Sequence, residues 1–563
     1  MLRIHELKLP LDHPEPELRQ AILRRLNLAA EALISFTVFK RAHDARKTSA
    51  IQLIYTIDAE MSDEAAVLNH FARDPHIVPS PDTSYRFVAR APSETARSAA
   101  RPIIVGMGPC GLFAGLILAQ MGFKPIILER GKIVRERTAD TFRFWRKGIL
   151  DPESNAQFGE GGAGTFSDGK LYSQVKDPRH LGRKVLTEFV DAGAPAEILY
   201  ASKPHIGTFR LVSMIERMRK KMEALGAEIR FGSRVTDILI SQRRDEKHIA
   251  GVVLSNGETL ESDQVVMALG HSARDSFEML YARGVFFEPK PFSIGVRIEH
   301  PQSVIDAARF GPSAGHPVLG AADYKLAHHA SNGRSVYSFC MCPGGTVVAA
   351  ASEQGRLVTN GMSQYSRIER NANAGIVVGV NPDDFPGDFR TDALAGIAFQ
   401  RHWEEQAYLA GGSNWNAPGQ TVGDFLARRP STALGSVIPS YKPGVTPTDL
   451  GLCLPTYAVD AIREALPAFG HQISGFSMDD AVMTGVETRT SSPVRMTRGK
   501  DLQSLSVRGF YPAGEGAGYA GGILSASIDG IKVAEALALN TSSDTNAQSR
   551  LLIALPSIAS TEN

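Results

Sequence analysis

A glycine-rich turn between a buried strand and an apolar helix is the feature of this 563-residue chain that most restricts its fold. Residues 101–131 read RPIIVGMGPCGLFAGLILAQMGFKPIILERG, with glycines at positions 106, 108 and 111. Gly106 permits the tight turn, Gly108 lets backbone approach a pyrophosphate, and Gly111 lets the helix pack closely on the strand. Glu129 ends the next strand 18 residues after Gly111, where an acid accepts hydrogen bonds from a ribose. The segment predicts a dinucleotide site on a doubly wound parallel sheet, with close packing alone as the less specific alternative.

Two further glycine-rich segments favour FAD over NAD as this dinucleotide. Residues 509–523, GFYPAGEGAGYAGGI, predict a strand, a turn carrying Glu515, and a helix whose free N–H groups can stabilise the negative charge of a reduced flavin. This turn resembles the closing motif of flavoproteins with two dinucleotide-binding domains, in which the acid holds a ribityl hydroxyl. Residues 158–170, FGEGGAGTFSDGK, offer backbone N–H groups to a pyrophosphate or a flavin, with a flexible surface loop as the alternative. No second strand–GxGxxG–helix unit occurs, so no built-in nicotinamide domain is expected.

Six segments together resemble one family, the bacterial FAD-dependent dehydrogenases, or NAD(P)/FAD-dependent oxidoreductases, related to the glutathione-reductase-like flavoproteins. They are residues 101–131 and the stretches NAQFGEGGAGTFSDGKLY, KPFSIGVRIEHPQ, SFCMCPGGTVVAAASE, GVETRTSSPVRM and YPAGEGAGYAGGI. The resemblance implies the fold and FAD as cofactor, and it defines no substrate. The residues expected to contact FAD are Gly106, Gly108, Pro109, Cys110, Gly111, Glu129, Arg130, Gly161, Gly162, Gly164, Thr165, Val235, Gly270, Gly514, Glu515, Gly521, Gly522 and Ile523.

The order of predicted elements indicates an α/β chain of three folded units. A Rossmann-like FAD-binding domain is expected at 100–285 and 486–540, interrupted by an inserted β-rich substrate domain at 286–485. Residues 1–95 predict a ferredoxin-like α+β domain with βαββαβ order, whose last strand is SYRFVARAP. A small polar linker at 93–101 and a flexible tail at 541–563 complete the chain.

Three groups of residues are candidates for the reaction itself. Glu487 and Arg489 are two residues apart, so on an extended strand both would face one side and could polarise a substrate. An internal salt bridge bracing the domain junction is the equal alternative. His271 follows the strand end MALG, where an imidazole could exchange a proton as hydride moves, or cap the next helix. Cys340 and Cys342 share one face of a predicted strand, and two structural thiols are favoured over a redox pair.

Composition excludes several classes of protein. A net charge of +1 argues against a protein that works by neutralising a phosphate backbone, and no apolar run reaches the roughly 18 residues of a membrane span. Four cysteines are too few for a disulfide framework, so a cytoplasmic location is expected. No cluster of ligands predicts a metal site. The connection RAHDARK is basic but lacks aromatic residues on which bases could stack, so nucleic acid is not the expected partner.

These observations predict an FAD-dependent oxidoreductase that transfers a hydride between flavin N5 and a small or medium organic substrate. The substrate is expected between the FAD-binding sheet and the inserted domain, because ligands collect in such clefts. Two alternatives stay open. One is a flavin monooxygenase reduced by transiently bound NAD(P)H, and the other is a flavin-bound module that binds RNA or protein.

Overall fold

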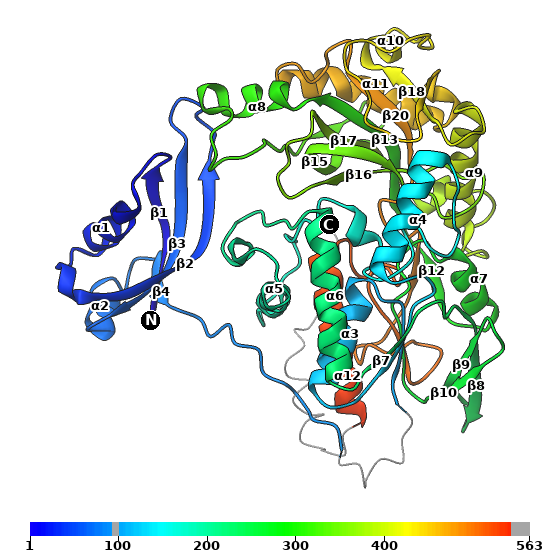
Figure 1. The fold of residues 1–563 in the computed structure, drawn as a ribbon, viewed down its shortest axis with the longest axis horizontal. Helices are drawn as coiled ribbons and strands as arrows, with labels where there is room; N and C mark the ends of the chain where they lie inside the picture. Colours follow the sequence, from blue (N-terminus) through cyan, green and yellow to red (C-terminus); the bar gives the residue numbers. More distant parts are fainter. Residues whose placement is uncertain (93–100, 542–563) are drawn as a thin grey trace.

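The computed structural model describes residues 1–92 and 101–541. The predicted linker, apart from Arg101, and the predicted tail after residue 541 lie outside the described residues. Figure 1 shows the N-terminal unit set to one side of the rest of the molecule. No helix within the two described ranges has the length and apolar character that crossing a membrane requires.

The N-terminal unit has the predicted βαββαβ order. Its four strands form an antiparallel sheet in the order β2-β3-β1-β4. The elements are β1 (Leu2–Pro10), α1 (Glu15–Leu26), β2 (Leu33–Asp44), β3 (Gln52–Met61), α2 (Glu64–His70) and β4 (Ile77–Pro79). Assignment of this unit to the ferredoxin-like class stays a prediction.

The prediction for the last strand of this unit is wrong. The strand is β4 at Ile77–Pro79, and residues 84–92 form no strand. Tyr85, Val88 and Ala91 instead pack against the apolar core of the neighbouring parallel-sheet domain. The alternation of apolar residues in this segment therefore reflects packing across a domain boundary, which has the same sequence pattern as a half-buried strand.

A five-stranded parallel sheet forms the centre of the larger body. Its order is β22-β11-β5-β6-β7, with β5 (Ile103–Val105), β6 (Ile126–Leu128), β7 (Glu228–Arg230), β11 (Val265–Met267) and β22 (Phe510–Pro512). Ile104 and Val266 belong to one apolar cluster, whereas Ile103 and Val265 belong to another. Because successive side chains of a strand face opposite sides, the sheet is buried on both faces, which explains its uniformly apolar strands.

Helices cover one face of the parallel sheet and a β-meander covers the other. Figure 1 shows α3, α6 and α12 together, and their apolar side chains share one cluster. The bounds are α3 (Pro109–Gln120), α5 (Leu181–Asp191), α6 (Thr208–Ala224) and α12 (Ile523–Thr541). The opposite cluster includes residues of β8 (Val235–Arg243), β9 (Glu246–Leu254), β10 (Thr259–Glu261) and α7 (Arg274–Ala282). The predicted Asn256-Gly257 turn joins β9 to β10, and α4 (Val134–Lys147) follows β6.

The inserted region contains the expected large sheet and also four α-helices. Seven strands follow the order β14-β15-β17-β13-β20-β18-β19, and β16 pairs with β15. The strands are β13 (Phe292–Pro301), β14 (Ala327–His329), β15 (Ser335–Ala349), β16 (Thr359–Ser363), β17 (Asn371–Val380), β18 (Ala417–Thr421), β19 (Val445–Pro447) and β20 (Val482–Glu487). The helices are α8 (Gln302–Phe310), α9 (Ala395–Ala410), α10 (Val422–Leu426) and α11 (Thr456–Gln472). The strands β12 (Phe287–Pro289) and β21 (Val494–Met496) form a short antiparallel pair. They lie where the chain enters and leaves the inserted region.

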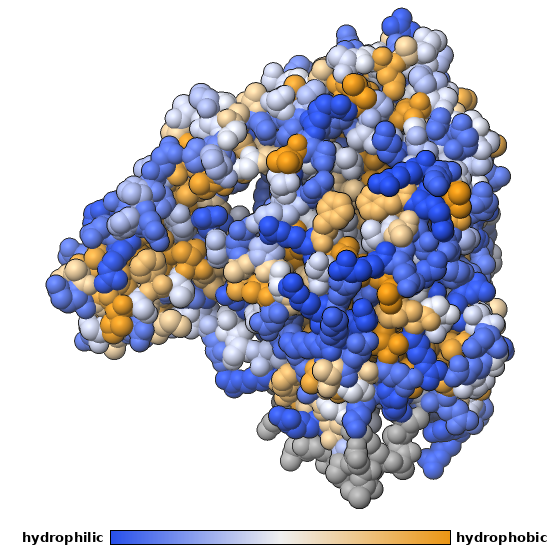
Figure 2. Space-filling model, viewed as in Figure 1, coloured by the Kyte–Doolittle hydropathy of each residue, from blue (hydrophilic) through white to orange (hydrophobic). Residues whose placement is uncertain are grey.

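Backbone hydrogen bonds connect the N-terminal unit to the larger body. The Arg41 N–H donates to the Tyr200 carbonyl at 2.7 Å, and the Ser202 N–H donates to the Arg41 carbonyl at 2.9 Å. Figure 2 shows hydrophilic and hydrophobic side chains interleaved over the face that the two bodies present, with a hollow between them. The edge strand β2 is therefore partly covered by residues 200–202.

Candidate functional site

The first glycine turn has the geometry that its sequence predicts. Gly106 has φ +97°, and a Cβ placed on it would lie 2.4 Å from the Ala268 carbonyl oxygen. A Cβ on Gly111 would lie 1.9 Å from the Gly106 carbonyl oxygen. Gly108 is the N-cap of α3 and caps it with no side chain. The first N–H groups of α3 are thus left for an external acceptor, which is how helix N-termini bind phosphate.

Glycines far apart in the sequence meet at this turn. A Cβ on Gly162 would lie 2.7 Å from the Gly108 Cα, and one on Gly164 would lie 2.9 Å from the Ile523 side chain. A Cβ on Gly514 would lie 2.8 Å from the Cys110 Cβ. The three predicted glycine segments, 106–111, 161–164 and 514–523, therefore form one cluster. Their contacts with a cofactor stay a prediction.

Three of the glycines predicted to contact FAD border open space. Gly270, Gly521 and Gly522 have no atom of the described residues within 4 Å of the place where a Cβ would stand. A small cavity of about 20 Å³ lies beside them, lined by residues that include Pro109, Gly161, Gly164, Thr165, Leu211 and Ile523. Open glycines next to a free helix N-terminus are typical of pyrophosphate sites, and FAD binding by these residues stays a prediction.

Glu129 connects the loops of the glycine cluster through hydrogen bonds. Its carboxylate accepts hydrogen bonds from the N–H groups of Met107 at 2.8 Å, Gly131 at 2.9 Å and Gly159 at 3.0 Å. The residue is 4% exposed. A carboxylate has about four acceptor positions, so one is left for a ribose hydroxyl. Glu129 therefore orders the loops, and its contact with a ribose stays a prediction.

Arg137 is a residue of the site that sequence reasoning missed. It lies on α4 with no exposed surface, and its guanidinium donates to the carbonyls of Asn155 at 2.8 Å, Ala156 at 3.0 Å and Glu160 at 2.8 Å. Burial lowers its pKa to about 10. It also donates to the hydroxyl of Thr165 at 3.3 Å. An arginine in an amphipathic helix gives no signal in one sequence, yet this one holds the second glycine loop in place.

Two predicted cofactor contacts have other partners in this structure. Arg130 forms ion pairs with Glu153 and Asp275, and its guanidinium lies 4.1 Å from the centre of the Phe158 ring. Val235 is 5% exposed at the start of β8. Arg130 is thus held at the edge of the site by two carboxylates, and Val235 belongs to the core under the sheet.

His271 and Glu515 lie together at the edge of the glycine cluster. The His271 Nδ1 is 3.2 Å from the Glu515 Oε1, and the His271 Nε2 is buried with no hydrogen-bond partner among the described residues. Lys290 lies close enough to feel the Glu515 charge, and burial lowers the pKa of Lys290. The structure therefore brings the strand end before His271 next to the turn that carries Glu515, although the two segments lie far apart in the sequence.

Glu487 and Arg489 do not lie on the same side of one extended strand, in contrast to the prediction. Glu487 is the last residue of β20 and pairs with Arg297, with Nε to Oε2 at 2.6 Å. Arg489 lies beyond the strand and pairs with Glu404 at 3.0 Å. Because β20 ends at Glu487, the alternation of side chains does not continue to Arg489. Each residue belongs to a separate internal salt bridge, which is the alternative that the sequence left open.

The ion pairs of these two residues differ in their effect on acidity. Burial raises the pKa of Glu487 to about 7, although Arg297 opposes this. Glu404 accepts from both Arg274 and Arg489, and these two cations hold the pKa of Glu404 well below its usual range despite burial. Arg489 also donates to the hydroxyls of Ser272 and Ser352. Its network thus reaches the residue that follows His271.

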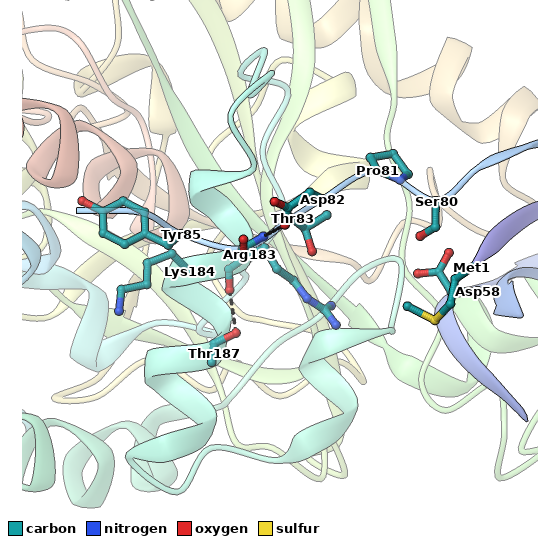
Figure 3. A pocket seen from close by; sticks show the side chains of 11 residues that line it. Met1, Asp58, Ser80, Pro81, Asp82, Thr83, Tyr85, Arg183, Lys184 and Thr187 are labelled. Carbon is teal, nitrogen blue, oxygen red and sulfur yellow. Dashed lines mark hydrogen bonds between the residues drawn. The ribbon is translucent and has the colours of Figure 1, made fainter. Parts of the chain in front are cut away.

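A larger cavity, of about 630 Å³, lies away from the glycine cluster. Figure 3 shows it between the N-terminal unit and α5, lined by residues that include Asp58, Asp82, Tyr85, Arg183 and Lys184. Arg183 donates to the Leu199 carbonyl, and Lys184 pairs with Glu188 at 2.6 Å. Most of the acidic and basic side chains that line the cavity form hydrogen bonds or ion pairs with other residues of the protein. The lining therefore favours neither a cationic nor an anionic ligand.

Comparison with known proteins gives a family. A family model described as "FAD-dependent protein, C-terminal domain-like" matches residues 291–490, and a domain of unknown function matches residues 1–60. A protein of Clostridium beijerinckii, described as uncharacterized, is 46% identical over 538 residues, 95% of this chain and 98% of the relative. The chain belongs to the same family as this clostridial protein. The match over residues 291–490 supports FAD as its cofactor.

Solved structures share a weaker similarity with the chain. The flavin-dependent brominase Bmp2 is 12% identical, covering 81% of this chain and 83% of that one with a TM-score of 0.36. A flavoprotein/dehydrogenase from Cytophaga hutchinsonii is 12% identical, covering 78% and 79% with a TM-score of 0.35. Similarity at this level carries no inference about the reaction of this family.

Proposed function

We propose that this chain is an FAD-dependent oxidoreductase of the dehydrogenase or reductase type that acts on a small or medium organic substrate. The observation that carries the proposal is the meeting of three glycine segments at one helix N-terminus, in a chain that matches an FAD-dependent family. Bound FAD would supply hydride transfer at its N5, while the protein supplies orientation, electrostatics and protons.

Each part of the cluster suits one part of FAD. The turn at 106–111 and the N-terminus of α3 would hold the pyrophosphate, and the free acceptor position of Glu129 would take a ribose hydroxyl. Gly521 and Gly522 precede α12, which begins at Ile523 and whose N-terminal N–H groups favour negative charge on a reduced ring. The loop at 161–165, held by Arg137, would cover the middle of the cofactor.

His271 is the proposed proton-transfer residue. The Glu515 carboxylate beside Nδ1 favours the tautomer that carries its proton there, which leaves Nε2 as a proton acceptor. That nitrogen has no partner among the described residues, so a substrate hydroxyl or amine could donate to it. Glu487 and Arg489 are not proposed as catalytic residues, because each is engaged in its own buried ion pair.

The substrate is proposed to bind between the parallel sheet and the eight-stranded sheet. Chain segments cross between these two bodies near β12 and β21, next to Lys290 and the 514–523 turn. The divisions 1–95, 100–285, 286–485 and 486–540 belong to the same proposal, as does kinship with the glutathione-reductase-like flavoproteins. A cytoplasmic location is also proposed, because all four cysteines are free.

An anaerobic titration of the purified full-length protein tests this function. The protein should carry FAD, or take it up on incubation, and its flavin absorbance should be followed as NADH or NADPH is added. Fast bleaching by one nucleotide would identify a reductase half-reaction, and oxygen-coupled consumption of that nucleotide would instead identify the monooxygenase. Bleaching by neither, followed by bleaching with an organic alcohol or amine, would identify a dehydrogenase. A protein that cannot hold FAD would contradict the proposal.

A further inference from the structure

Two cysteines occupy an irregular position in the strand β15. Cys340 has φ +42°, a conformation rare for residues other than glycine, and the register of β15 against β17 shifts between Phe339 and Cys342. Such backbone strain is typical of sites with a function beyond packing. The bulge folds the strand so that the Cys342 thiol donates to the Cys340 carbonyl at 3.3 Å. The two thiols are therefore neighbours on one irregular stretch of β15.

Two cations flank this pair from different elements. The Arg297 guanidinium on β13 donates to the Cys340 carbonyl at 2.9 Å, and the Lys170 ammonium donates to the Met341 carbonyl. Arg297 also pairs with Glu487, whereas none of the ion pairs among the described residues includes Lys170. Asp168 lies nearby but pairs with Arg367. The positive charge of Lys170 is therefore left to act on the two thiols.

The surroundings shift the acidity of the two thiols in opposite directions. The neighbouring Cys342 side chain, with the charges of Lys170 and Arg297, holds the pKa of Cys340 well below its usual range against the effect of burial. The pKa of Cys342 is raised by the neighbouring Cys340 side chain and by burial. Burial also raises the pKa of the two other cysteines, Cys110 and Cys453. Only a thiolate is a strong nucleophile, so Cys340 is distinguished from the other three.

We propose that Cys340 and Cys342 form a peroxide-reactive thiol pair at the boundary between the 158–170 loop and the inserted domain. In the first step the Cys340 sulfur attacks one oxygen of a hydroperoxide. The O–O bond breaks, an S–O bond forms, and the leaving oxygen departs as water or an alcohol after taking up a proton. In the second step the Cys342 sulfur attacks the Cys340 sulfenic acid, an S–S bond forms, and water leaves. The hydroperoxide is reduced by two electrons and the two thiols are oxidised by two.

The geometry of the strand permits this disulfide. A disulfide joins Cα atoms about 4.4–6.8 Å apart. Residues two apart on a regular strand lie within this range, at about 6.6 Å, and the register of β15 shifts at this pair. Cys340 is half-buried and Cys342 is fully buried, so a small peroxide reaches Cys340 first. The pair therefore has the order of attack that the two steps require.

Mass spectrometry of the full-length protein tests the proposal directly. Both cysteines fall in one tryptic peptide, residues 335–356, and Cys110 and Cys453 fall in others. After brief treatment with hydrogen peroxide, this peptide should lose the mass of two hydrogens while the other two cysteines still react with iodoacetamide. The thiol pair should be oxidised about tenfold or more faster than Cys110 and Cys453. Met341 in the same peptide provides an internal control, since its oxidation adds one oxygen instead.

Single variants separate the two steps. In Cys342→Ser the sulfenic acid of Cys340 should persist and be captured by dimedone, and in Cys340→Ser peroxide should leave Cys342 unchanged. Circular dichroism of both variants would show that they are folded. Lys170→Met should slow the oxidation of Cys340 if the ammonium stabilises the thiolate. Equal rates at all four cysteines, or a fully reduced 335–356 peptide after treatment, would overturn the proposal. None of these measurements depends on the proposed flavin reaction.

Discussion

Gly162 lies against Gly108 so closely that a Cβ on Gly162 would be 2.7 Å from the Gly108 Cα. Gly162→Ala should therefore weaken FAD binding and destabilise the protein by about 1–3 kcal/mol through overpacking, beyond the cost of its φ. Gly232→Ala is a control for the positive φ alone, because Gly232 has the same φ of +62° and no atom of the described residues within 4 Å of a Cβ placed on it. Gly232→Ala should lower the free energy of unfolding only by the roughly 1–2 kcal/mol that a left-handed backbone costs a residue with a Cβ. Urea unfolding and FAD titration would measure both, and equal losses would contradict the role of this contact.

Removal of the Arg137 guanidinium should disorder the second glycine loop. Arg137→Met leaves three buried carbonyls without donors, so we expect a loss of about 3–5 kcal/mol in unfolding free energy and weaker retention of FAD. Arg135→Met on the same helix is the control. Its side chain is 68% exposed and, among the described residues, forms an ion pair only with Glu216, so its effect should stay within about 1 kcal/mol. Wild-type stability and wild-type flavin content in Arg137→Met would show that the second glycine loop is ordered without Arg137.

Because His271 is proposed to exchange a proton during the reaction, its replacement should slow flavin reduction and leave FAD bound. His271→Asn should reduce flavin at least about 100-fold more slowly with whichever electron donor proves active, while the FAD content per chain is unchanged. Glu515→Gln should slow the reaction less, because it perturbs the orientation of the ring and leaves Nε2 in place. His248→Asn, on the meander strand β9, is the control histidine. Stopped-flow reduction would measure all three, and an unchanged rate in His271→Asn would remove it from the mechanism.

The raised pKa of Glu487 predicts the direction in which stability varies with pH. Its folded pKa of about 7 lies above the ordinary 4.5, so the folded state binds more protons between these values and its stability falls as pH rises through this window. Glu487→Gln should abolish this component, which is on the order of 3 kcal/mol. Glu404→Gln should keep the wild-type slope between pH 5 and pH 8, because the lowered pKa of Glu404 contributes stability that is lost only as pH falls below the ordinary value. Urea unfolding from pH 5 to pH 8 would compare the three proteins, and parallel profiles for wild type and Glu487→Gln would contradict the assignment.

The glycines of the cofactor cluster could be predicted because steric necessity acts on them directly. A side chain at Gly106 or Gly111 would overlap backbone, so the sequence must carry glycine at those positions. The free N-terminus of α3 and the acid at Glu129 are similarly local features. Their meeting with the 514–523 turn follows from the order of strands in a parallel sheet.

The residues that sequence reasoning missed or misplaced depend on tertiary partners. Nothing in the pattern of α4 distinguishes Arg137, which is buried with the loop carbonyls, from the exposed Arg135. The spacing of Glu487 and Arg489 suggested a shared face, but it could not show that β20 ends between them. Residues 84–92 alternate like a strand because they lie on the neighbouring domain. Each of these differences reflects a contact between segments far apart in sequence.

The position of β22 has a consequence for the growing chain during synthesis. This strand pairs with β11, and the turn that follows it completes the glycine cluster. The turn at 106–111 therefore leaves the ribosome hundreds of residues before the last part of its own ligand site exists. Until residue 512 is made, β11 has an unpaired edge, the kind of surface that promotes misassembly. Newly made chains of this family should thus depend on chaperones until translation ends, and FAD should stabilise only the finished protein.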